Sequence, residues 1–110
     1  MKTREEIVHL IQGFHEKLAA IYGNRLKGVY LFGSYARDEA DEDSDVDIAV
    51  VLEGPIKRSN ELRRISELRA ELSLQNHIVL MPFFLSEEEF QKTPEAIFRS
   101  KVNEGVLGNF

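Results

Sequence analysis

Two aspartates, Asp45 and Asp47, open a short run whose remaining residues, Ile48 to Leu52, are all apolar. Side chains alternate between the faces of a strand, so both carboxylates are expected on one face, about 6 to 7 Å apart along the backbone. Unpaired acids in an otherwise apolar strand cost on the order of several kcal/mol unless a cation or hydrogen bonds compensate them. Hard oxygen ligands at this spacing can share one or two magnesium ions. The pair is therefore predicted to bind metal.

A glycine and a serine, Gly33 and Ser34, follow an apolar stretch that is typical of a strand, Leu26 to Phe32. We expect the chain to turn here into a short helix, whose unpaired backbone N–H groups and dipole would point at one position. That position suits a phosphate, with the Ser34 hydroxyl as a further donor. Magnesium in proteins is usually held by a couple of carboxylates together with substrate phosphates. The turn and the Asp pair together predict a site for a metal-bound nucleoside triphosphate.

Each of these features also has a plain structural interpretation. Gly-Ser is common in turns, and the acidic run from Asp38 to Asp43 is typical of a solvated loop. Arg37, beside this run, either steadies phosphate or forms a surface ion pair. An EF-hand calcium loop beginning at Asp41 is excluded, because Val46 stands where that loop needs glycine and Leu52 where it needs glutamate.

The composition indicates one small acidic domain spanning residues 1–110. A chain of 110 residues that is 43% hydrophobic suits a single core. A net charge of -5 would repel a phosphate backbone, so nucleic acid is not expected as a partner. There is no cysteine, which excludes thiolate metal sites and thiol nucleophiles. No apolar run approaches the roughly 20 residues of a membrane span, and the first helix is too charged for a signal peptide, so we expect a soluble, cytoplasmic protein without membrane partners.

Hydrophobic spacing and turn residues predict the elements that position these groups. Helices are expected over 3–22 and 59–74, and strands over 26–32, 45–52 and 78–85.

The ends of several elements carry recognisable signals. Thr3 and Glu6 form a candidate capping box for the first helix. Pro82 cannot donate a ladder hydrogen bond, so the third strand is expected at a sheet edge or a bulge. Ser86 is expected to cap a short helix, and Pro94 to begin a last one. The predicted fold is α/β, a small mixed sheet with helices mainly on one side, in which the first two strands carry the site at neighbouring ends.

The spacing of these residues closely resembles the signature of the minimal nucleotidyltransferases (MNT) of the DNA polymerase beta-like superfamily. That signature is Gly-Ser, ten residues, then Asp-x-Asp, and it is matched without a gap by Gly33-Ser34 and Asp45-Val46-Asp47. The likeness extends to Phe32 before the glycine and Ala36-Arg37 after the serine. The order of helices and strands is compatible over nearly the whole chain.

This resemblance implies the polymerase beta-like fold and a nucleotidyl transfer. By that likeness, Gly33 and Ser34 would hold the triphosphate of ATP, with Arg37 beside them. Asp45 and Asp47 would be the catalytic residues and would bind two Mg²⁺ ions, which activate an acceptor hydroxyl and steady the departing pyrophosphate. Attack on the α-phosphorus would transfer AMP.

The resemblance also points to a protein partner. Larger members of the superfamily hold the base and the acceptor with an added helical domain, and these 110 residues hold no such domain. A separate protein is therefore expected to complete the site in a homo- or hetero-oligomer. The family likeness implies a HEPN toxin, which its MNT antitoxin neutralises by transferring AMP to a tyrosine.

Two departures from the family's pattern bear on catalysis. Asp38 stands where a glycine usually follows Ala-Arg, and no acid occurs from His77 to Leu85, where many members carry a third carboxylate. Without that acid the acceptor hydroxyl lacks its expected general base, although short members of the group can also lack it. AMP transfer to a toxin is thus the first hypothesis, and neutralisation by binding alone is the alternative. Nucleotidyl transfer to a small hydroxylated molecule is less expected.

Overall fold

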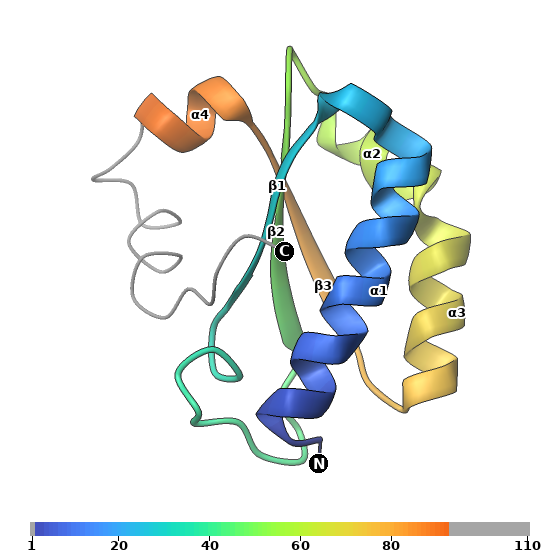
Figure 1. Cartoon of the computed structure of the whole chain (residues 1–110), viewed down its shortest axis with the longest axis vertical. Helices are drawn as coiled ribbons and strands as arrows, with labels where there is room; N and C mark the ends of the chain where they lie inside the picture. The colour runs from blue at the N-terminus through green and yellow to red at the C-terminus, as the bar shows by residue number, and fades with distance from the viewer. Residues whose placement is uncertain (1, 93–110) are drawn as a thin grey trace.

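A three-stranded mixed sheet forms the centre of the molecule in the computed structural model, which describes residues 2–92 (Figure 1). Its strands are β1 (Leu26–Phe32), β2 (Val46–Leu52) and β3 (Leu80–Ser86). β1 runs antiparallel to β2, and β2 runs parallel to β3, so β2 is the central strand. The predicted small mixed sheet is confirmed.

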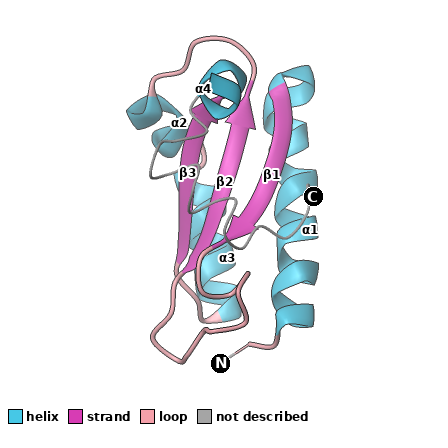
Figure 2. Ribbon diagram, turned by 90° about the vertical axis from the view of Figure 1, so that its left-hand side faces the viewer, coloured by secondary structure: helices cyan, strands magenta, loops and turns pink. Residues whose placement is uncertain are grey.

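Helices cover one face of the sheet almost completely. α1 (Arg4–Tyr22), α2 (Arg58–Arg64) and α3 (Ser66–Asn76) lie on that face, whereas the short α4 (Glu87–Lys92) lies on the other (Figures 1 and 2). A 3₁₀ turn, η1 (Gly23–Arg25), joins α1 to β1. The predicted placement of the helices, mainly on one side, is correct.

The core fills the space between the sheet and the three helices. Side chains of α1 enter it at helical spacing, and alternate side chains of β2 enter it from the sheet. The fully buried members are Ile7, Ile11, Phe14, Leu18, Val29, Leu31, Val46, Ile48, Val50, Leu52, Ile65 and Leu80.

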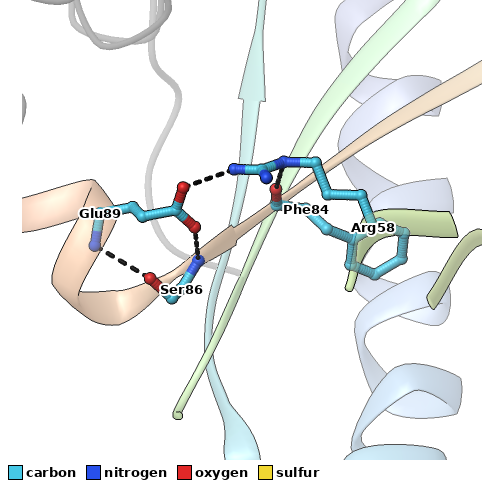
Figure 3. Close-up of polar contacts among 4 residues, drawn as sticks. All are labelled: Arg58, Phe84, Ser86 and Glu89. Atoms are coloured by element: carbon cyan, nitrogen blue, oxygen red, sulfur yellow. Dashed lines mark hydrogen bonds and ion pairs between the residues drawn. The ribbon is translucent and has the colours of Figure 1, made fainter. Parts of the chain in front are cut away.

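Both predicted caps are present. The Thr3 hydroxyl accepts a hydrogen bond from the Glu6 N–H at 3.1 Å, and the Thr3 N–H donates to the Glu6 carboxylate at 2.9 Å. The same reciprocal pair joins Ser86 and Glu89 at the start of α4, with both distances 3.0 Å (Figure 3). Pro82 lies in β3, an edge strand of the described sheet, as predicted. The helix expected after Pro94 lies outside the described residues.

The single helix predicted over 59–74 is wrong, because the chain forms two helices that break at Ile65. Ile65 has φ -102° and ψ 8°, outside the helical range, and its side chain is fully buried. The hydroxyl of Ser66 donates to the carbonyl of Arg63 at 2.9 Å, and this local bond competes with the helical pattern. The break turns the chain so that α2 and α3 each pack against β3. Within the described residues, no helix is long and apolar enough to cross a membrane.

A buried polar contact joins the end of α1 to α2. The Tyr22 hydroxyl donates to the carboxylate of Glu61 at 2.9 Å, and both residues are buried. Arg25 and Arg64 lie over the Tyr22 ring, 5.9 and 5.8 Å from its centroid, and Arg64 also reaches the Glu61 carboxylate at 3.8 Å. Burial raises the pKa of Tyr22 above its ordinary value, and the hydrogen bond to Glu61 raises it further.

Replacing Tyr22 by phenylalanine should destabilise the protein, because the buried Glu61 carboxylate then loses its hydroxyl donor. The expected loss is about 1–3 kcal/mol in the free energy of unfolding. Thermal and urea unfolding would measure it. Tyr30→Phe is the matched control, since the Tyr30 hydroxyl makes no hydrogen bond within residues 2–92. Equal effects of the two substitutions would contradict a specific role for the Tyr22–Glu61 bond.

Candidate active site

The antiparallel pairing of β1 and β2 brings the two halves of the sequence motif together. Phe32, the last residue of β1, is the cross-strand partner of Asp47, so Gly33 follows directly beside that aspartate. The end of β1 and the start of β2 lie together at the lower end of the sheet in Figure 2. The motif residues thus lie at neighbouring ends of the first two strands, as predicted.

The two aspartates lie at the start of β2, and Asp47 is on the sheet face opposite the main core. Val46 and Ile48 are fully buried toward the helices, whereas Asp47 between them is half-buried. Asp45 is exposed and precedes β2 by one residue, since the strand begins at Val46 rather than at Asp45 as predicted. The expected alternation is observed at Val46, Asp47 and Ile48, so Asp47 is on the face opposite the helices.

Gly33 occupies a position that accepts no side chain. Its φ of +76° lies in the left-handed region, which residues with a Cβ rarely adopt. A Cβ built at this position would also overlap the Asp47 carboxylate. The glycine therefore lets the backbone turn and lets the chain pass directly against Asp47.

The segment after Gly33 is a tight series of turns, so the short helix predicted there is wrong. The N–H of Arg37 donates to the Gly33 carbonyl at 3.1 Å, and the N–H of Glu39 donates to the Ser34 carbonyl at 2.8 Å. These bonds leave the backbone N–H groups of Ser34, Tyr35 and Ala36 without an acceptor in the described part of the chain. Successive unpaired N–H groups in a turn form an anion-binding concavity even without a helix. The phosphate-binding expectation therefore rests on this turn.

A hydrogen bond from α1 holds this turn in place. The guanidinium of Arg4 donates to the Ala36 carbonyl at 2.7 Å. Tyr35 and Ala36 are buried in the main core, which anchors the turn on its inner side. Arg4 could not be identified from the sequence, because no spacing or periodicity signals a contact across 32 residues.

Arg37 and the acidic loop lie at the surface. The structure therefore shows Arg37 in the surface ion pair that was one of the two interpretations of this residue. Arg37 is exposed and forms an ion pair with Glu39 at 3.1 Å. The Asp41 carboxylate accepts hydrogen bonds from the Asp43 N–H at 2.9 Å and the Ser44 hydroxyl at 3.2 Å. These bonds form a compact turn that leads the chain into Asp45.

A valine, Val79, immediately precedes β3 and lies next to Asp45. Val46 pairs with Leu80, and the Val46 N–H donates to the Val79 carbonyl at 2.8 Å. Continuing this parallel register by one residue places Val79 beside Asp45 on the same face. Val79 is 49% exposed, and it lines with Asp45 a cavity of about 750 Å³. Among the described residues, no group of three or more His, Cys, Asp or Glu is placed to hold a metal ion.

The donor set fits a magnesium ion that is bound together with substrate. Asp45 and Asp47 supply two hard oxygen ligands, and the turn after Gly33 supplies N–H donors for phosphate beside them. Magnesium commonly takes one or two carboxylates and completes its coordination with water and substrate phosphates. Two carboxylates beside a turn with unpaired N–H groups are the donor types that a metal-bound nucleotide needs.

Comparison with known proteins identifies the class of protein. Residues 11–103 match the family described as nucleotidyltransferase domain. The chain belongs to this family, and it is accordingly a transferase of the nucleotidyltransferase class, as predicted.

Relatives support this assignment along most of the chain. Over 102 residues the chain is 32% identical to "Putative protein adenylyltransferase MJ0141" of Methanocaldococcus jannaschii, covering 92% of this chain and 97% of that protein. It is 49% identical over 53 residues to "Protein adenylyltransferase MntA" of Thermococcus cleftensis, which covers 48% and 52% of the two chains. A crystal structure of a "putative nucleotidyltransferase" from Sulfolobus solfataricus aligns with a TM-score of 0.56 at 28% identity, over 81% of this chain and 75% of that one.

Placing alanine at Gly33 is expected to weaken ATP binding by about tenfold or more. The left-handed backbone costs alanine about 1–2 kcal/mol, and the added methyl group must also displace the Asp47 carboxylate. Titration with ATP and Mg²⁺ in a calorimeter would measure the change. Gly54→Ala is the matched control, since Gly54 has φ +81° but nothing lies within 4 Å of its added Cβ. A normal ATP affinity in Gly33→Ala would contradict the assigned role.

Proposed function

We propose that this protein transfers AMP from ATP, with Mg²⁺, to a tyrosine hydroxyl of a partner HEPN-family toxin and thereby acts as its antitoxin. The observation that carries the proposal is the juxtaposition of Asp47 with Gly33 and the unpaired N–H groups that follow it. Relatives named protein adenylyltransferases support a protein acceptor. The toxin and the tyrosine come from the resemblance of the Gly33 to Asp47 motif to the MNT group.

The proposed roles follow from where each residue lies. The turn at Ser34 to Ala36 binds the triphosphate through its backbone N–H groups, and Arg4 keeps that turn in place through the Ala36 carbonyl. Asp45 and Asp47 hold the metal at the start of β2, beside the end of β1. Bound magnesium would neutralise phosphate oxygens and polarise the acceptor hydroxyl. Arg37 is proposed to turn from Glu39 toward the phosphates, a movement its exposure permits.

The reaction is a displacement at the α-phosphorus. The acceptor oxygen forms a bond to that phosphorus, the bond from it to the bridging oxygen of the β-phosphate breaks, and pyrophosphate leaves with the electron pair. The hydroxyl proton passes to solvent or to a base of the partner. The side chain next to Asp45 in the cavity is that of Val79, which cannot accept a proton as a carboxylate there would.

Neutralisation of the toxin by binding alone is the second candidate function. The observation that favours it is the two-carboxylate site, which lacks a third acid among the described residues. Under this hypothesis the nucleotide site is retained while the complex masks the toxin. Protection of cells would then survive loss of both aspartates.

The proposal is tested by mixing the purified protein, the product of its neighbouring gene, Mg²⁺ and ATP labelled on the α-phosphate. Label on a tyrosine of the partner, found by mass spectrometry as an added AMP, is the expected result. ATP labelled on the γ-phosphate is the control, since AMP transfer leaves that label in pyrophosphate. A stable complex without label would favour the binding antitoxin. Labelling from the γ-phosphate would overturn nucleotidyl transfer in favour of phosphorylation.

A further inference from the structure

An apolar groove runs along the outer edge of β3, between that strand and the helices α2 and α3. Its volume is about 460 Å³. Two of its large apolar side chains are exposed to solvent, Leu62 by 40% and Phe83 by 37%. The lining residues are Arg58, Leu62, Arg69, Met81, Pro82, Phe83, Phe84 and Leu85. Exposed apolar surface of this kind in a concave site is typical of a contact with another molecule.

The edge of β3 is closed to a further strand. Alternate carbonyl groups along a strand point to the same edge, so those of Leu80, Pro82 and Phe84 share the outer one. Arg69 donates to the Leu80 carbonyl at 2.7 Å, and Arg58 donates to the Phe84 carbonyl at 3.0 Å (Figure 3). Pro82 has no N–H to offer. Strand addition would have to break both arginine bonds and still lack a donor in the middle of the edge.

The two arginines differ in their charge balance. Arg58 forms an ion pair with Glu89 at 2.6 Å (Figure 3). Arg69 is half-buried, and besides the Leu80 carbonyl it contacts the Met81 sulfur at 3.7 Å. Within residues 2–92 it has no ion pair with a carboxylate. A partly buried guanidinium beside apolar side chains is complementary to a carboxylate brought by a binding partner.

We propose that this groove is a docking surface for an amphipathic helix of a partner protein that carries an acidic flank. The apolar side of that helix contacts Leu62 and Phe83, and one of its carboxylates pairs with Arg69. A helix satisfies its own backbone, so it can dock beside an edge that rejects a strand. Met81 in the groove is the cross-strand partner of Asp47, so a protein docked here lies about one strand spacing from the proposed site. Docking does not depend on AMP transfer.

Two helical peptides of the same length would test the proposal against the full 110-residue protein. Both carry leucine at positions i, i+3, i+4 and i+7, and they differ only in having glutamate or lysine beside that apolar face. NMR titration is expected to shift the amide signals of Leu62, Arg69 and Phe83. The glutamate peptide should bind about tenfold more tightly, which is the effect of one partly buried charge pair.

Two variants localise the charge effect. Arg69→Gln keeps a donor for the Leu80 carbonyl but removes the charge, so the two peptides should then bind almost equally. Arg63→Gln, on the exposed surface of α2 and outside the groove, should leave the tenfold preference intact. The proposal is overturned if neither peptide binds, if they bind equally to the unmodified protein, or if the shifts lie elsewhere. It is also overturned if dilution alone produces the shifts, because a second copy of the chain then occupies the groove.

Discussion

The double variant Asp45→Asn, Asp47→Asn is expected to lose AMP transfer by about 10³-fold or more. Asparagine keeps the size and hydrogen-bonding oxygen of each side chain but removes the charge that holds a divalent cation. Stabilising the charge that develops on the transferring phosphoryl group contributes several kcal/mol, and each 1.36 kcal/mol is about tenfold in rate. The measurement is the initial rate of α-label incorporation into the partner at saturating ATP.

The control for this double variant is a carboxylate at the opposite end of β2, Glu53. Glu53 follows β2 at its far end, where it forms an exposed ion pair with Lys27 at 3.6 Å. Glu53→Gln should leave the transfer rate within about twofold, since a surface ion pair contributes little. Both proteins should unfold at temperatures close to that of the unmodified chain. Full activity of the double variant would refute the metal assignment, whereas loss of label with intact cellular protection would select the binding antitoxin.

The part of the site that the sequence predicts is the part that depends on local geometry. Strand alternation predicts the face of Asp47, and the burial of its neighbours Val46 and Ile48 agrees with it. Gly33 was singled out from spacing, but the reason it must be glycine, the close approach of Asp47, depends on the pairing of two strands. The sequence pattern identifies Gly33, but only the tertiary contact with Asp47 explains why this residue must be glycine.

The features that sequence reasoning missed arise from contacts between distant residues or from side chains that compete with the backbone. Arg4 reaches the Ala36 carbonyl only after α1 has packed on the sheet. The apolar spacing of 59–74 is continuous, yet the Ser66 hydroxyl and the buried Ile65 break the helix there. Glu61 resembles a solvent-facing helix residue in the sequence, and its burial depends on Tyr22 at the end of another helix.

The residue beside Asp45 determines whether this protein can activate an acceptor by itself. Val79 is 49% exposed and lines the same cavity as Asp45, so a carboxylate at this position would project into that space. Val79→Asp is therefore expected to raise the rate of AMP transfer by about 10²-fold, the lower end of the contribution of a positioned general base. It should also tighten Mg²⁺ binding, because the site gains a third hard oxygen ligand.

Val79→Asn separates the effect of charge from the effect of shape. It has nearly the same size as the aspartate variant but no proton-accepting carboxylate, so its rate should stay near that of the unmodified protein. Turnover is measured at saturating ATP and partner, and Mg²⁺ affinity by titration in the presence of ATP. A rise in both quantities for aspartate alone would mean that the two-carboxylate site is a weakened form of a three-carboxylate one. Tighter metal binding without a faster rate would mean that the partner already supplies the general base. The carboxylate of Val79→Asp would then be redundant, because the partner's base already removes the proton of the acceptor hydroxyl.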